Sequence, residues 1–185
     1  MTAARPPRAD AQRNRARVLA AAEQVFAQRG SSASTEEVAR AAGVGVGTVF
    51  RHFPTKEALL QALIVQRLTR IAADAREQAA SPDPAAFFDF FAAVVGDSAS
   101  KLELVDALAE LGGDPTEAIA PVAEELTAAV AVLLEQAQQD GAVRKDVGVA
   151  HVIALLAGAS QARRYAADER PLAVILDGLR APNAE

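Results

Sequence analysis

Apolar residues recur every three or four positions along most of this chain, the spacing that gives a helix one buried face. The first helix predicted in this way covers residues 14–30. A second, short helix begins after Ser34, which forms a capping-box pattern with Glu37, and it ends at Gly43. A third helix is predicted over residues 46–53. The first part of the chain is therefore expected to be one long helix followed by two short ones.

The rest of the chain continues in the helical pattern. A long helix is predicted over residues 56–79, followed by a phenylalanine-rich helix that opens at Asp83 and Pro84. Pro121 is expected to restart or kink the helix that ends near residue 139. Further helices are predicted over residues 100–111, 147–167 and 171–180. The sequence thus predicts an all-α fold of about nine helices.

The composition supports this prediction and excludes several kinds of site. The chain is rich in alanine, the best helix former. It has no Cys and only two His, His52 and His151, which excludes a disulfide framework, a redox thiol and a Cys/His zinc site. No cofactor is expected. The longest apolar runs are far shorter than the roughly 20 residues that span a bilayer, and the start of the chain lacks a secretory signal. We therefore expect a soluble, cytoplasmic protein that does not contact membranes.

Charge is distributed unevenly along the chain. The net charge is −5, but residues 1–56 carry nine Lys and Arg against four Asp and Glu, whereas residues 80–185 carry seven against 17. Such an asymmetry is typical of a small head that binds a polyanion, carried on an acidic body that repels it. A chance drift of surface charge would give the same distribution.

Residues 34–53 have the spacing of a helix-turn-helix, two short helices separated by a turn that contains glycine. On the second helix, Val49 and Phe53 share the face that must pack inward. The opposite face carries Gly47 and Arg51, with Thr48 and Phe50 beside them. Arginine pairs with guanine edges, and Thr or Phe contacts the thymine methyl group, so this face has the groups needed to read a major groove. An ordinary helical hairpin with a surface arginine is the alternative.

Three ordered stretches carry a more specific signal: RVLAAAEQVFAQRG (17–30), VARAAGV (38–44) and GTVFRHFPTKEAL (47–59). With them, residues 13–60 resemble the DNA-binding domain of the TetR family of transcriptional repressors. The resemblance implies a three-helix DNA-binding head, joined by a long helix to a helical-bundle body for effector binding and dimerisation. Residues 1–12 are then expected to be a flexible basic arm, 13–56 the DNA-binding domain and 57–185 the body.

The resemblance also implies individual DNA contacts. The matching recognition-helix positions are Gly45, Val46, Gly47, Thr48, Phe50, Arg51 and His52. Lys56 and the hydroxyl region at Ser34 and Thr35 match groups that bind backbone phosphate. Four arginines of the N-terminal region could follow the backbone or enter a minor groove: Arg5, Arg8, Arg13 and Arg15. In two departures from the family pattern, Phe50 stands where Tyr is usual and Gly45 replaces a common Ser or Thr. Phosphate affinity is therefore expected to rest on Lys56 and the arginines.

The body is expected to bind a small, mainly apolar effector and to form a homodimer. Candidate effector contacts are Phe87, Phe88, Phe91, Leu108, Leu126 and Val130. For any single phenylalanine among them, a place in the core is the favoured interpretation. The last two helices carry apolar stripes that would form a four-helix bundle with a second copy, or would only close the monomer core. These candidate dimer residues are Val149, Val152, Ile153, Leu156, Leu172, Ile175, Leu176 and Leu179.

The predicted function is that of a homodimeric repressor that binds a palindromic double-stranded DNA operator and releases it when an effector moves the long helix. An enzyme is not expected, because the chain has no Gly-rich phosphate loop, nucleophile elbow or plausible Ser-His-Asp set. A purely structural or partner-binding helical module would explain the body but not the basic head. Among single residues, His52 could instead pack or cap its helix, Arg40 is expected to be solvated, and His151 to lie on a helix surface or interface.

Overall fold

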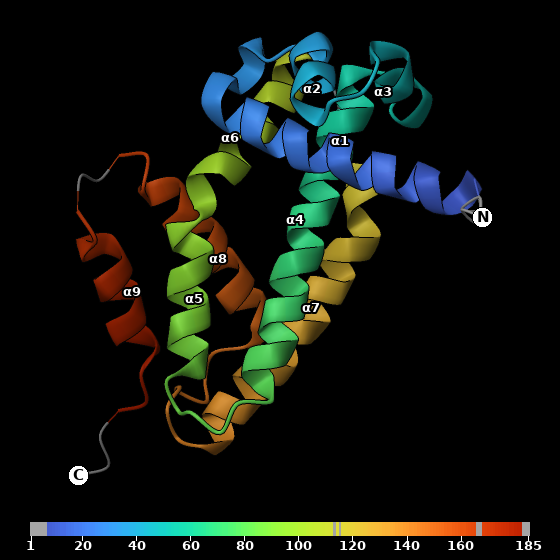
Figure 1. Ribbon diagram of the computed structural model, residues 1–185. Coiled ribbons are helices and arrows are strands. Elements are labelled where there is room, and N and C mark those ends of the chain that lie inside the picture. The colour runs from blue at the N-terminus through green and yellow to red at the C-terminus, as the bar shows by residue number, and fades with distance from the viewer. Residues whose placement is uncertain (1–6, 113, 115, 166–167, 183–185) are drawn as a thin grey trace. The chain divides into compact units, whose positions relative to one another are not determined.

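The computed structural model describes residues 7–112, 114, 116–165 and 168–182 (Figure 1). Within these ranges the chain is all-α, and its one β-type contact is an isolated antiparallel bridge between Val143 and Arg180. The helices are α1 (Pro7–Arg29), the 3-10 helix η1 (Gly30–Ser32), α2 (Thr35–Ala42), α3 (Val46–His52), α4 (Lys56–Ala79), α5 (Ala86–Gly96), α6 (Ser98–Glu110), α7 (Thr116–Gln139), α8 (Val149–Ala162) and α9 (Arg170–Leu179). The predicted fold class is confirmed.

The chain forms two compact units. The first contains the described residues up to Val65 together with residues 103–118, and the second contains residues 66–102 and those from Ile119 onward. Helices α4, α6 and α7 therefore each contribute residues to both units. The domains predicted from the sequence, by contrast with these compact units, meet at residue 56, and residues 103–118 fall in the predicted body. The division by function, a DNA-binding part and an effector-binding part, stays a prediction.

In the first unit, α1 packs against α2 and α3, and α2 packs against α3 (Figure 1). The side chains that make this core are those placed inward by helical spacing. They are Val18, Leu19, Ala22, Phe26, Val38, Ala39, Val49 and Phe53, all buried. Burying such apolar surface stabilises the unit by roughly 25 cal/mol for each square ångström removed from water. This core is what fixes the position of α3.

In the second unit, α5 lies against α8 and α9. Apolar residues cover nearly the whole circumference of α5, so this helix is buried on several sides at once. Phe87, Phe88, Phe90 and Phe91 all belong to one core cluster with residues of α4, α7 and α8. The rings of Phe87 and Phe88 meet edge to face, with centroids 5.5 Å apart. The phenylalanine-rich segment is therefore primarily core.

Several helix boundaries differ from those predicted, and α8 ends at Ala162 rather than near residue 167, because residues 163–165 form a turn. α1 begins at Pro7 rather than near residue 14, so residues 7–12 are helical, while residues 1–6 lie outside the described ranges. α5 begins at Ala86, because the Asp83 carboxylate accepts the N–H of Ala85 at 2.9 Å and forms a turn before the helix. α7 continues through Pro121, where the missing N–H removes one helical hydrogen bond without ending the helix.

Candidate functional site

The first element of the site is the start of α2, where the predicted capping box is present. The Ser34 hydroxyl oxygen accepts the N–H of Glu37 at 3.2 Å, and the Glu37 carboxylate accepts the N–H of Ser34 at 3.0 Å. Two amide groups that the helix leaves without partners are thus satisfied. A guanidinium nitrogen of Arg29, at the end of α1, lies 3.5 Å from the same carboxylate. The box therefore fixes both the start of α2 and its approach to α1.

The capping box makes the stability of α2 dependent on pH. The pKa of Glu37 is lowered below its ordinary value, first because the backbone N–H of Ser34 donates to the carboxylate and then because Arg29 lies nearby. A lowered pKa stabilises the folded state fully above the ordinary pKa of 4.5, and this contribution is lost as the pH falls through the folded-state pKa. We expect amide hydrogen exchange in α2 to accelerate over that acidic range. Glu37→Gln, which does not titrate, should show no such step, and equal pH profiles would contradict the role of Glu37.

The turn between α2 and α3 is held by a contact that the sequence analysis did not identify. Gly43 adopts a left-handed conformation with φ of 64° at the end of α2. The guanidinium of Arg17, on α1, donates to the carbonyl oxygen of Ala42 at 2.6 Å. A cation at this end of the helix also interacts favourably with the helix dipole. A Cβ at position 43 would lie 3.1 Å from an Arg17 nitrogen, so the glycine leaves room for this contact.

The α3 helix presents the two faces that its sequence predicts. Val49 is completely buried and Phe53, directly after the helix, is 3% exposed. On the opposite side, Gly47 and Arg51 are exposed, and Phe50 is 41% exposed. Of the other residues predicted to contact DNA from this helix, Gly45 is exposed, and Val46, Thr48 and His52 are half-buried. The face is thus available for binding, and DNA contact by these residues stays a prediction.

Lys56, at the start of α4, has a structural partner in addition to its predicted phosphate role. Its ammonium donates to the carbonyl oxygen of Ser31 at 2.7 Å and lies 5.7 Å from the centre of the Phe26 ring. An ammonium has three donors, so this bond leaves others for a phosphate. The Ser34 hydroxyl is engaged in the capping box, and the Thr35 hydroxyl lies 3.4 Å from a Glu36 carboxylate oxygen.

The arginines of the N-terminal region are placed in different ways. The guanidinium of Arg15 lies over the Phe53 ring, 5.1 Å from its centre, so this side chain covers the core under α3. Arg13 forms an ion pair with Asp10 on the exposed side of α1. Arg5 and the side chain of Arg8 lie outside the described part of the structure. A backbone-following role for these arginines stays a prediction.

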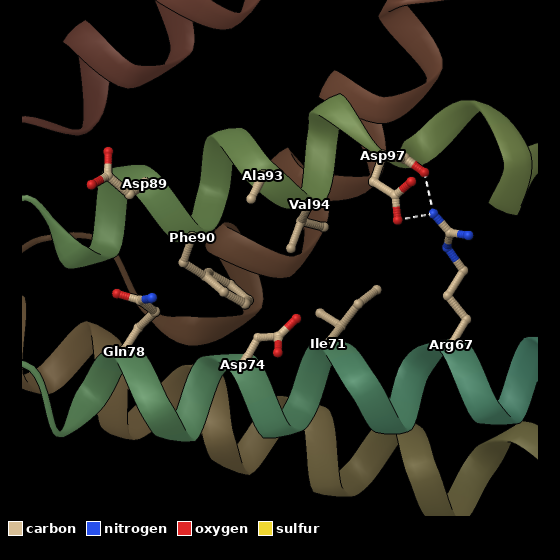
Figure 2. Close-up of a pocket in the computed structure, with 9 residues that line it drawn as sticks. All are labelled: Arg67, Ile71, Asp74, Gln78, Asp89, Phe90, Ala93, Val94 and Asp97. Atoms are coloured by element: carbon tan, nitrogen blue, oxygen red, sulfur yellow. Dashed lines mark hydrogen bonds and ion pairs between the residues drawn. The ribbon is translucent and has the colours of Figure 1, made fainter.

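The second unit contains a pocket of about 380 Å³ between α4 and α5 (Figure 2). Its α4 wall consists of Arg67, Ile71, Asp74 and Gln78. The opposite wall consists of Asp89, Phe90, Ala93 and Val94 of α5 and of Asp97, directly after it. At one end, Arg67 donates to the carbonyl oxygen of Asp97 and forms an ion pair with its carboxylate. A chamber of this volume is within the range that holds small organic ligands.

A second, smaller pocket of about 200 Å³ lies in the same unit and is mainly apolar. It is lined by residues of α4, α5, α7 and α8, among them Leu68, Leu126, Ile153 and Leu156. Ile71 and Val94 line both pockets, so the two spaces adjoin at these residues. The unit thus offers two adjoining compartments, and the charged side chains line the larger one.

The residues predicted to contact an effector do not line one common pocket. Leu126 lines the apolar pocket, and Phe87 lines a space of about 10 Å³, which holds no more than a water molecule. Phe88, Phe91 and Val130 belong to the core cluster, while Leu108 is buried in the first unit. Phe90 is the phenylalanine that lines the larger pocket. Helical spacing alone could not select it, because apolar residues surround α5. Effector binding by the predicted residues stays a prediction.

The candidate dimer residues lie on α8 and α9, which pack together in the second unit. Val152, Leu156 and Leu179 are buried within the chain itself. The half-buried members of the set are Val149, Ile153, Leu172, Ile175 and Leu176. These stripes therefore contribute to the monomer core first, and the half-buried positions leave apolar surface for a second copy. The dimer stays a prediction.

Metal-binding clusters and membrane-spanning helices were sought among the described residues only. There, no three His, Asp or Glu side chains lie close enough together to hold a metal ion. Likewise, none of the helices in the described part of the chain has both the length and the apolar character needed to cross a bilayer.

Comparison with known proteins gives matches over both parts of the chain. Residues 18–63 match the family described as bacterial regulatory proteins, tetR family. Residues 82–181 match the family described as transcriptional regulator SbtR-like, C-terminal domain. The HTH-type transcriptional regulator UidR of Escherichia coli K12 is 41% identical over 69 residues, which cover 37% of this chain and 35% of UidR. The chain thus matches little more than a third of that relative's length.

Two solved structures are similar along nearly the whole chain. A TetR transcription regulatory protein from Mycobacterium vanbaalenii is 44% identical, with a TM-score of 0.78, and the match covers 95% of this chain and 100% of that one. A TetR transcriptional regulator from Streptomyces coelicolor is 34% identical, with a TM-score of 0.73, and the match covers 92% of this chain and 99% of that one. The similarity includes the second unit, where the sequence motifs are weakest.

Proposed function

The chain belongs to the TetR family of bacterial transcriptional regulators, and on that premise we propose that it is a ligand-responsive repressor that binds a palindromic operator as a homodimer. The observation that carries the proposal is the exposed face of α3, where Gly47, Phe50 and Arg51 lie opposite the buried Val49. A guanidinium, an aromatic edge and a glycine that permits close approach of the backbone are the groups that read a major groove.

Support for a DNA-reading role also comes from the way α3 is held. The capping box, the Arg17 bond to Ala42 and the Lys56 bond to Ser31 all fix the elements that surround α3. A recognition helix must keep its orientation to read bases, because base contacts depend on the geometry of paired donors and acceptors. The first unit therefore combines an exposed reading surface with a rigid support.

We propose that two copies bind together through α8 and α9. One helix of seven residues offers little contact area, so two half-sites separated by about one helical turn, ~34 Å, are needed for a specific complex. The half-buried apolar residues of α8 and α9 supply a surface of the right chemistry for a second copy. As a chromosome-binding regulator, the protein would act in the bacterial cytoplasm, and we propose no catalytic activity for it.

We propose that effector binding in the second unit controls operator release. The pocket uses Arg67, Ile71, Asp74 and Gln78 from α4, a single continuous helix that also contributes its first residues to the first unit. A ligand that prefers one position of this helix would shift the population toward it. The size of the shift is limited by the difference between the ligand's affinities for the two states.

The proposed function is tested by footprinting the purified protein across sheared DNA of its source genome at two salt concentrations. We expect one or a few short palindromes near promoters, occupied by a dimer, with affinity that falls as salt rises. Absence of any enriched site at low salt would overturn the repressor proposal. The exposed face of α3 would then have to serve a protein partner, which a pull-down would identify.

Arg51→Ala separates base reading from phosphate binding. We expect this variant to lose about 1–3 kcal/mol of discrimination at one base pair of each half-site, with a smaller loss on random DNA. Lys56→Ala is the comparison for a phosphate contact, which contributes equally on every sequence, and its melting temperature reports any effect of losing the Ser31 bond. Its affinity should fall uniformly, with a weaker dependence on salt. Equal losses of Arg51→Ala on operator and random DNA, measured by fluorescence anisotropy, would show that Arg51 does not read a base.

A further inference from the structure

The pocket of the second unit has a more definite chemistry than an apolar cavity. Asp74 and Gln78 project from α4 toward α5, and Phe90 and Val94 project from α5 toward α4 (Figure 2). The carboxylate of Asp89 lies on the side of α5 away from α4 in the same view. A carboxylate, an amide and an aromatic ring therefore converge on the space between the two helices.

Acidic side chains outnumber basic ones in the lining of this pocket. Four ionisable groups line the pocket, and they are Arg67, Asp74, Asp89 and Asp97. Arg67 is only 7% exposed, and its guanidinium is committed to the carbonyl oxygen and the carboxylate of Asp97. This pair is neutral as a unit, which leaves Asp74 and Asp89 as the net charge of the lining. Of these two, Asp74 is the one that faces α5.

The groups that converge with Asp74 are those that favour a cation. A carboxylate attracts a cation by charge, and the face of an aromatic ring such as Phe90 attracts it through the ring quadrupole. Ile71 and Val94 continue from this point into the apolar pocket beyond, where Leu126 and Ile153 lie. The two compartments together match a molecule with one charged end and one apolar end.

We propose that the effector of this protein is an organic cation with an apolar tail, its charged group between Asp74 and Phe90 and its tail in the compartment lined by Leu126. The proposal rests on the ligand-responsive role given above and names the ligand class for it. A neutral apolar ligand would displace the water that hydrates the Asp74 carboxylate. It would offer no hydrogen bond or charge in return, so its binding would cost free energy. An anion would meet Asp74 directly, because the nearby guanidinium of Arg67 is already paired.

Isothermal titration calorimetry with three probes of equal chain length tests this inference. The probes are decyltrimethylammonium and decanoate, each below its micelle concentration, and decanol below its solubility limit, all added to the full chain without DNA. We expect decyltrimethylammonium to bind at one site per chain, and decanol and decanoate to bind at least about fivefold more weakly. Equal or tighter binding of decanoate, or no saturable binding of decyltrimethylammonium, would overturn the proposal.

Asp74→Asn is the variant that locates the cation. It preserves the shape of the exposed side chain and removes its charge, so we expect the affinity for decyltrimethylammonium to fall at least about fivefold while decanol binding stays unchanged. Glu135→Gln is the matched control, because it removes an exposed charge from α7 in the same unit without lining the pocket. Unchanged cation affinity in Asp74→Asn, or an equal loss in Glu135→Gln, would refute the placement.

Failure of this inference can be told apart from failure of the proposed function. Binding of an operator by a protein that does not bind the cation would remove only the ligand class. Binding of the cation through Asp74 by a protein without an operator would confirm the site and remove the repressor role. Because the calorimetry uses no DNA, the two results are independent.

Discussion

Phe53→Ala is expected to lower the free energy of unfolding by about 3–5 kcal/mol and to abolish operator binding at ordinary temperatures. The ring is 3% exposed, lies under the Arg15 guanidinium and directly follows α3. Its removal would leave a cavity beneath the recognition helix and remove a cation–π contact at the same time. A loss of this size is a large part of the roughly 5–15 kcal/mol that stabilises a typical domain. Urea denaturation followed by circular dichroism measures it.

Phe50→Ala is the control for this result, because the same residue type lies three positions earlier on the exposed side of α3. Phe50 is 41% exposed, so its removal should change the free energy of unfolding by less than about 0.5 kcal/mol. If Phe50 contacts DNA as we expect, the variant would nevertheless bind the operator more weakly. Similar destabilisation by the two substitutions would show that the assignment of the two faces of α3 is wrong.

Phe91→Ala is expected to destabilise the second unit by a similar amount, about 3–5 kcal/mol. The Phe91 ring is fully buried, lies 6.4 Å from the ring of Phe87 and belongs to the core cluster rather than to the wall of either pocket. We therefore expect the loss to appear as a lower melting temperature, with any loss of ligand affinity following from unfolding. Differential scanning calorimetry with and without the cationic probe separates the two effects.

Val132→Ala provides the comparison for Phe91→Ala. Val132 lies on α7 in the same unit but is 58% exposed, so its truncation should leave the melting temperature nearly unchanged. A melting temperature for Phe91→Ala equal to that of Val132→Ala would mean that α5 is not buried as described. The pair thus tests the burial of α5 independently of any ligand.

The sequence predicts the helix-turn-helix well because its determinants are local. Ser34 and Glu37 are three residues apart, and both bonds of their capping box are present. Val49 and Phe53 are one helical turn apart, which is enough to place them on the same buried face. Gly43 ends α2 in a left-handed conformation, as its position in the pattern indicates. Signals within one or two turns of a helix therefore carry through to the structure.

Contacts between distant residues were not predictable in the same way. The bonds from Arg17 to Ala42 and from Lys56 to Ser31 each join residues 25 positions apart, and no spacing rule links such pairs. The choice among the four phenylalanines of α5 also depends on which neighbouring helix each one meets. Phe90 and Phe91 both belong to the core cluster, but only Phe90 also lines the larger pocket, a distinction set by packing against other helices. The proposed ligand class likewise depends on Asp74, which a helical pattern marks only as a surface charge.

Residues 103–118 belong to the first unit although they lie far from residues 1–65 in the sequence. This affects the design of chimeras between this protein and its relatives. A chimera that exchanged only residues 1–65 for those of a relative would pair a foreign head with the native 103–118 segment, whose buried Leu104 and Leu108 are matched to the original unit. Successful exchange of operator specificity would then require both segments to be transferred together, or only the exposed face of α3 to be changed. If the exposed face of α3 reads the operator as proposed, substitutions on that face would change specificity more readily than an exchange of residues 1–65.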